Sequence, residues 1–128
     1  MPARYVILMD RRLVVSMGWG RLTFSDFRCQ QDAFKNDPTF DPTFDQLVDV
    51  TQVEHLELTT EQAKIIAARG IFHASSRRAV VARKPSIFGT ARMMDAYHSV
   101  ATGRNHVRVF YDRDAALQWL GLDSLPEV

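Results

Sequence analysis

Residues 47–62, LVDVTQVEHLELTTEQ, determine how the chain must be organised. The segment begins with apolar residues typical of a buried strand, passes through an acidic stretch, and ends in two threonines that precede a helix-forming run. Thr59 and Gln62 have the spacing of a capping box, in which each side chain bonds a free backbone N–H at the helix start. A buried strand that leads directly into a helix is typical of an α/β sheet with crossover connections.

The same alternation extends toward both ends of the chain. Residues 4–20, RYVILMDRRLVVSMGWG, form two apolar runs around a charged turn, which predicts an antiparallel hairpin with a bend or bulge at Gly18 and Gly20. Helices are predicted at 23–36, 59–70, 86–103 and 112–121, with further strands at 44–50, 77–85 and 106–112. The fold class is therefore α/β with the order β-β-α-β-α-β-α-β-α, a five-stranded mixed sheet and four helices.

The predicted core draws on nearly all of these elements, and we place residues 13–19 of the hairpin at a sheet edge. Trp119 is expected to cover an edge, and Cys29 to be a small buried residue on the first helix. Thr23 with Asp26, or alternatively Ser25, is expected to cap that helix. The predicted core residues are Val6, Leu8, Val14, Phe27, Leu47, Val48, Val50, Ile66, Val80, Val81, Val109, Leu117 and Leu120.

Composition indicates one domain, residues 1–122, with a short C-terminal tail at 123–128. A net charge of +1 gives no reason to expect nucleic acid, and no apolar run is long enough for membrane insertion. Because the one cysteine cannot form an internal disulfide and the N-terminal apolar run is too short for a signal peptide, we expect a soluble cytoplasmic protein.

Charge is distributed unevenly along the sequence. Residues 23–61 contain nine acidic side chains against two basic ones, whereas residues 62–94 contain seven basic side chains and no acidic one. Either the two halves neutralise each other when they fold together, or the surface is bipolar and docks a partner or an anion.

No enzymatic motif is present. The four histidines, His55, His73, His98 and His106, lie on different predicted elements and lack metal-ligand spacing. The chain also lacks a nucleophile elbow, a P-loop and a dinucleotide fingerprint, so we expect no cofactor and no enzyme activity, although Asp49 remains a carboxylate whose partners the sequence does not identify.

Three motifs resemble a known family: LVDVTQV at 47–53 leading into a helix, AVVA at 79–82 followed by FGTARMM at 88–94, and VRVFYDRDAALQWLGL at 107–122. Over nearly its whole length, the chain resembles the SpoIIAA-like family, within the STAS-like fold of anti-sigma-factor antagonists. In the antagonist branch, the strand–helix turn reads Asp followed by two serines, and a partner kinase phosphorylates the first serine. Glu57 matches that aspartate, Leu58 the phosphorylated serine and Thr59 the second serine.

Leu58 has no hydroxyl, so the switch that the resemblance implies cannot operate at that position. Thr59 and Thr60 remain alternative acceptors if the register differs by one residue. The capping box offers a simpler account of Thr59.

The segment SIFGTARMM, at 86–94, supports two interpretations. Ser86 and Gly89 could present backbone amides to an anion, with Arg92 reaching back. Alternatively, one face of this helix packs in the core and Gly89 permits close packing. In the second case Phe88 and Met93 fall outside the core, and we expect them to be exposed on a partner or ligand surface.

The leading hypothesis is a non-enzymatic regulatory or protein-interaction module that binds an unidentified protein. Its surface would consist of the helix starts at the carboxyl ends of the parallel strands: Glu57, Thr59, Thr60, Ser86, Phe88, Gly89, Arg92 and Met93. The alternative is a carrier of a small hydrophobic ligand or lipid, with a pocket between the second and third helices. A homodimer and a small apolar or anionic ligand are further hypotheses.

Replacing Thr59 with alanine should lower the free energy of unfolding by about 1 kcal/mol, because the helix loses its N-cap acceptor. Thr59→Ser and Thr59→Asp should restore most of that loss, since each retains an oxygen for the same N–H. Thermal melts check this, and a Thr59→Ala protein that melts at the wild-type temperature would contradict the capping role.

Overall fold

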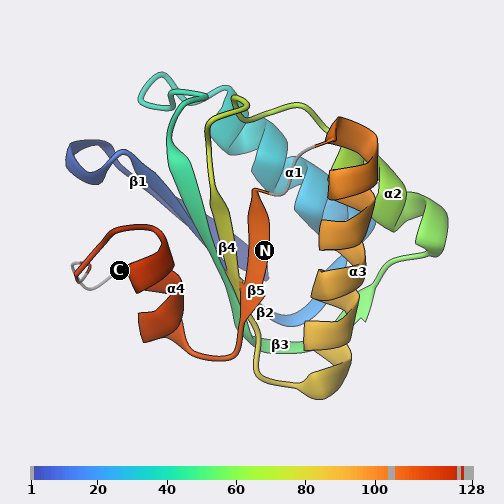
Figure 1. The fold of residues 1–128 in the computed structure, drawn as a ribbon. Coiled ribbons are helices and arrows are strands. Elements are labelled where there is room, and N and C mark those ends of the chain that lie inside the picture. Colours follow the sequence, from blue (N-terminus) through green and yellow to red (C-terminus); the bar gives the residue numbers. More distant parts are fainter. Residues whose placement is uncertain (1, 104–105, 124, 126–128) are drawn as a thin grey trace.

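A computed structural model describes residues 2–103, 106–123 and 125, and it confirms the predicted fold class (Figure 1). The sheet has the order β1-β2-β3-β4-β5, in which β1 is antiparallel to β2 and the remaining neighbours are parallel. Its strands are β1 (Ala3–Leu8), β2 (Leu13–Thr23), β3 (Asp45–Glu57), β4 (Arg78–Val81) and β5 (Val107–Phe110). The helices are η1 (Met9–Arg11), α1 (Phe24–Lys35), α2 (Thr60–Ala68), α3 (Pro85–Thr102) and α4 (Arg113–Trp119).

The sheet separates two layers of helices: α1, α2 and α3 cover one face, and α4 covers the other (Figure 1). Side chains of β3 alternate between the layers, so Leu47 packs with α4 whereas Val48 and Val50 face α1–α3. Both faces of the central strand are therefore covered, as expected for a parallel sheet. None of the described helices is long and apolar enough to cross a membrane.

The strand β3 is much longer than predicted. The sequence indicated a strand at 44–50 followed by an acidic turn, but β3 continues to Glu57 and pairs with β2 as far as Thr23. Register shifts next to Gly18 and Gly20 interrupt this ladder, and Gly20 has a φ of 62°, which a glycine adopts without strain. The predicted bulge is confirmed, although the strand continues beyond it.

Other expectations need correction. Residues 13–19 are not at an edge, because β2 lies between β1 and β3, and the two edges are β1 and β5. Cys29 is exposed rather than buried. Of the predicted core, Val6, Leu8, Phe27, Val48, Val80 and Val109 are only half-buried, while the other residues are buried. In the predicted tail, Leu125 packs on the α4 cluster, and residues 124 and 126–128 lie outside the described residues.

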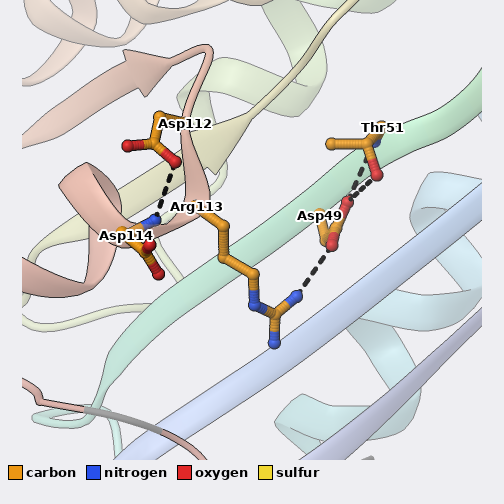
Figure 2. Close-up of polar contacts among 5 residues, drawn as sticks. All are labelled: Asp49, Thr51, Asp112, Arg113 and Asp114. Carbon is orange, nitrogen blue, oxygen red and sulfur yellow. Dashed lines mark hydrogen bonds and ion pairs between the residues drawn. The ribbon is translucent and has the colours of Figure 1, made fainter.

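One ion pair connects α4 to the centre of the sheet (Figure 2). Asp49 Oδ2 accepts a hydrogen bond from Arg113 Nη1 at 2.8 Å. Asp49 Oδ1 accepts from Thr51 N at 2.9 Å and from Thr51 Oγ1 at 2.7 Å. Asp112 Oδ1 accepts from Asp114 N at 3.2 Å and caps the same helix. The partners that the sequence left open for Asp49 are thus structural: they fix the position at which α4 begins.

Asp49→Ala should lower the free energy of unfolding by about 1–3 kcal/mol, because the substitution removes charge-assisted bonds at a carboxylate that is only 17% exposed. Asp10→Ala is a matched control, since Asp10 is 76% exposed and, within the described part of the chain, pairs only with its neighbour Arg11. Urea unfolding measures both effects. Equal stability of the two variants would contradict the structural role of Asp49.

Candidate functional site

The joint between β3 and α2 has the predicted capping box. Thr59 Oγ1 accepts a hydrogen bond from Gln62 N at 3.1 Å, and Gln62 Oε1 accepts from Thr59 N at 3.0 Å. Thr60 is the first residue of the helix and is exposed. Glu57 forms an exposed ion pair with Arg21 Nε at 3.2 Å. The first helix has an equivalent box formed by Thr23 and Asp26, which confirms that predicted cap as well.

The start of α3 differs from the prediction. Pro85 is its first residue and Lys84 its N-cap, so Ser86 lies inside the first turn and its carbonyl accepts from Thr90 Oγ1 at 3.0 Å. A Cβ built on Gly89 meets no atom within 4 Å, so close packing does not explain this glycine. Ile87 and Ala91 form the buried face of α3, as predicted for the packing interpretation.

The two helix starts follow strands that end at different levels of the sheet. β3 runs on from Val50 to Glu57 beyond the end of β4, whose last residue, Val81, pairs with Asp49. Lys84 Nζ, at the α3 start, lies 3.5 Å from the carbonyl oxygen of Glu54, within this extension. The start of α3 therefore lies beside the last part of β3, which leads on to the joint at Thr59.

A groove of about 430 Å³ follows the edge strand β5 instead, and it brings together two of the predicted residues. Phe88, Arg92 and Asp95 line it from α3, where their spacing places them on one face of the helix. β5 and Trp119 of α4 complete the wall, with Arg108 on β5. Of the predicted surface, only Phe88 and Arg92 belong to this groove.

The aromatic residues of this region are more enclosed than expected. Phe88 is half-buried because its ring stacks on that of Tyr111 at a centroid distance of 3.8 Å. Trp119 packs against Phe110 of β5, which agrees with its predicted place at a sheet edge. Met93 is 38% exposed, as predicted, but it does not line the groove.

A buried carboxylate lies in the same groove. Asp95 Oδ1 is buried and has no hydrogen-bond partner among the described residues. Desolvation raises the pKa of Asp95 above its usual value, while His98 and Arg92 nearby act in the opposite direction. An unpaired buried acceptor of this kind is costly and favours a donor from outside the chain.

A second space lies inside the domain, between the sheet and helices α1–α3. This cavity of about 110 Å³ is lined mostly by apolar side chains, together with Ser16, Gln46, Arg78 and two glutamines of α1. A pocket between the second and third helices was predicted as an alternative, but these polar residues were not predicted to line it. A signal existed in the sequence, because Ser16, Gln46 and Arg78 interrupt or border the apolar strand runs.

Ion pairs connect the acidic and basic segments in part. Arg69 pairs with Asp32, and Arg77 pairs with Asp45 at 3.6 Å, so the two halves neutralise each other at these points. Within the described residues, no group of three or more His, Cys, Asp or Glu side chains is placed to hold a metal ion.

Comparison with known proteins supports the architecture. No family model matches the sequence, and no curated protein matches it. An uncharacterised protein of the DUF3478 family from Shewanella loihica PV-4, with a SpoIIAA-like fold, is similar in structure: the TM-score is 0.60 at 18% identity over 92% of this chain and 93% of that chain. The chain therefore has a SpoIIAA-like fold, as its motifs implied, and a likeness at this identity establishes the fold alone.

His98 generates a testable pH dependence. Its Nδ1 lies 3.0 Å from the carbonyl oxygen of Ala67, which can only accept, so Nδ1 carries the hydrogen. Burial lowers the pKa of His98 below its usual 6.5, and the Arg78 guanidinium lowers it further, against the opposing effect of the Ala67 bond. The stability that the neutral ring contributes is therefore complete above pH 6.5 and is lost as pH falls through the lower pKa of the folded state.

His98→Gln, which retains an N–H donor for Ala67, should lose less stability than the wild type between about pH 7.5 and pH 5. His55→Gln is the control because His55 is exposed on β3. Urea unfolding at each pH measures the difference, and parallel pH curves for the wild type and His98→Gln would contradict the prediction.

Proposed function

We propose that this domain acts by binding rather than by catalysis, as a regulatory protein-interaction module that works without a cofactor. Its partner would be a protein that adds an extended, acidic segment alongside β5. The observation that carries this proposal is the open outer side of β5, which borders the 430 Å³ groove between α3 and α4. In Figure 1, β5 stands at the front of the sheet with α3 and α4 on either side.

The main chain of β5 supports strand addition. Among the described residues, β5 pairs only with β4, so its outer N–H and C=O groups are available to another chain. Extended peptides bind exposed sheet edges in this way, with main-chain hydrogen bonds for affinity and side-chain pockets for specificity. The strand is short and carries Arg108, features that protect an edge from unselective pairing.

The charges of the groove favour an acidic partner. Arg92 and Arg108 are exposed on its walls, and no ion pair joins either residue to a described residue. Asp95 supplies the only carboxylate among the described residues that line it, and its buried oxygen can accept a donor from the incoming segment. Two free guanidinium groups beside an open strand favour a segment with Asp or Glu side chains.

The regulatory part of the proposal does not require a phosphorylation switch at the β3–α2 joint. Leu58 cannot accept a phosphate, and the Thr59 hydroxyl already accepts a bond from Gln62 N. Regulation would follow from occupancy of the groove, with the partner supplying the signal. The exposed thiol of Cys29 suits a cytoplasmic location, where thiols stay reduced.

A charge-reversal experiment tests this function. Wild type, Arg92→Glu, Arg108→Glu and Arg4→Glu proteins are immobilised, and the proteins each retains from a matched lysate are identified by mass spectrometry. Arg4 is exposed on β1, the opposite edge, and is the control. Both groove variants should weaken capture of the same partner by about tenfold or more, whereas Arg4→Glu should retain it.

Hydrogen exchange then tests the mode of binding. A partner that adds a strand should protect amides of residues 107–110, and its capture should weaken with added salt. Capture that all four proteins share equally would refute the proposed groove. Light scattering separates a further outcome, since a homodimer that shields the same amides without a partner would make a second copy of this chain the occupant.

A further inference from the structure

Arg78 carries a half-buried charge that no carboxylate among the described residues neutralises. It is the first residue of β4 and lines both the inner cavity and a neighbouring cavity of about 80 Å³ beneath Phe72, His98 and His106. The guanidinium carbon lies 4.9 Å from the centre of the Phe72 ring. Within the described residues, no carboxylate pairs with the guanidinium and no acceptor bonds it. Burial lowers the pKa of Arg78 from 12.5 to about 10, so the group remains charged at neutral pH.

The residues around Arg78 do not compensate its charge. The described residues that line the two cavities include no aspartate or glutamate, whereas Arg69, His73, His98 and His106 lie around the smaller one. Arg69 is already paired with Asp32. A cation that is partly withdrawn from water and lacks a counter-charge favours a bound anion.

Polar groups continue from Arg78 across the floor of the cavity. Gln46 is the register neighbour of Arg78 on β3, and its Nε2 donates to Ser16 Oγ of β2 at 2.8 Å. Both residues are buried, at 6% and 2% exposure. Gln30 of α1 lines the same cavity, and its buried Nε2 has no hydrogen-bond partner among the described residues. The half-buried guanidinium of Arg78 and the unsatisfied amide nitrogen of Gln30 therefore border one cavity.

The remaining wall is apolar and comes from helices and strands alike. Phe27, Phe34, Val50, Leu56 and Ile66 contribute to it. A cavity of about 150 Å³ in an apolar core holds a molecule the size of benzene, so 110 Å³ has room for a tail of about four to six carbon atoms. The space therefore combines a small apolar volume with a cationic end.

We propose that this cavity binds a small carboxylic acid, whose carboxylate pairs with Arg78 while its hydrocarbon tail lies between the sheet and helices α1–α3. A planar guanidinium matches a carboxylate through two parallel hydrogen bonds. One cation also balances one negative charge, which favours a carboxylate over a phosphate dianion. Gln30 Nε2 supplies a second donor at the cavity wall. This site is separate from the proposed partner groove and does not depend on it.

Hexanoate is the probe for the experiment, and methyl NMR of isotopically labelled protein is the readout. Hexanoate should shift the methyl signals of Ile66, Val48 and Val80, which line or border the cavity. Hexylamine, with the same tail and the opposite charge, should leave them unchanged. Arg78→Met should weaken hexanoate binding by about tenfold or more, whereas Arg83→Met, at an exposed arginine just after β4, should bind as the wild type does.

Stability distinguishes a ligand site from a structural arginine. Arg78→Met removes an unpaired, half-buried charge and keeps an unbranched apolar side chain, so it should melt at or above the wild-type temperature. Ala91→Met keeps the charge but fills the cavity from α3, and it should also abolish the hexanoate shifts. This variant tests the site even if Arg78→Met does not fold. Absence of hexanoate shifts in the wild type, or equal affinity in the wild type and Arg78→Met, would overturn the proposal.

Discussion

The central strand β3 imposes the constraint on which the rest of this domain depends, because helices cover both of its faces. Each polar side chain on the covered part of β3 must form a hydrogen bond or ion pair within the protein, because a buried polar group without a partner destabilises the folded state. Asp49 finds Arg113 and Thr51 on the α4 face, and Gln46 finds Ser16 on the opposite face. These pairs fix how the chain crosses the sheet, since each one joins elements that lie far apart in the sequence. Arg78, the neighbour of Gln46 on β4, has no such partner among the described residues, and this half-buried charge is the feature that favours a ligand site.

Local chemistry made much of the fold predictable. The capping boxes at Thr23 and Thr59 were visible in the sequence because both partners lie three residues apart and need no tertiary information. The alternation of apolar strands with helices likewise determines the crossovers, and hence the parallel sheet. The start of α3 was misplaced by one residue because Pro85 suits the first helical position, whereas Ser86 resembles a cap.

Strand order and the sites depend on contacts that sequence patterns do not encode. The hairpin strand β2 was assigned to an edge, yet β3 pairs along its whole length, including the polar stretch from Thr51 to Glu57 that resembles a turn when it is considered alone. Phe88 was expected to be exposed, because the sequence does not reveal its stacking partner. That partner, Tyr111, follows a different strand and meets Phe88 only in the folded protein. The inner cavity combines residues of seven elements, so the isolated charge of Arg78 appears only once those elements are assembled.

The two proposed sites meet at one residue, and this has a thermodynamic consequence. Val107 lines the groove and both cavities, and it is the register neighbour of Arg78. A ligand at Arg78 therefore lies one strand away from the edge that would receive a partner. If occupation of the cavity changes the position of β5, the partner must change ligand affinity by the same factor, because coupling between two binding equilibria is reciprocal. If β5 does not move, tight binding at one site leaves the other unaffected, since a ligand shifts an equilibrium only by its differential affinity for the two states. The short β4–β5 ladder, four residues on each strand, is the element on which any such coupling would act.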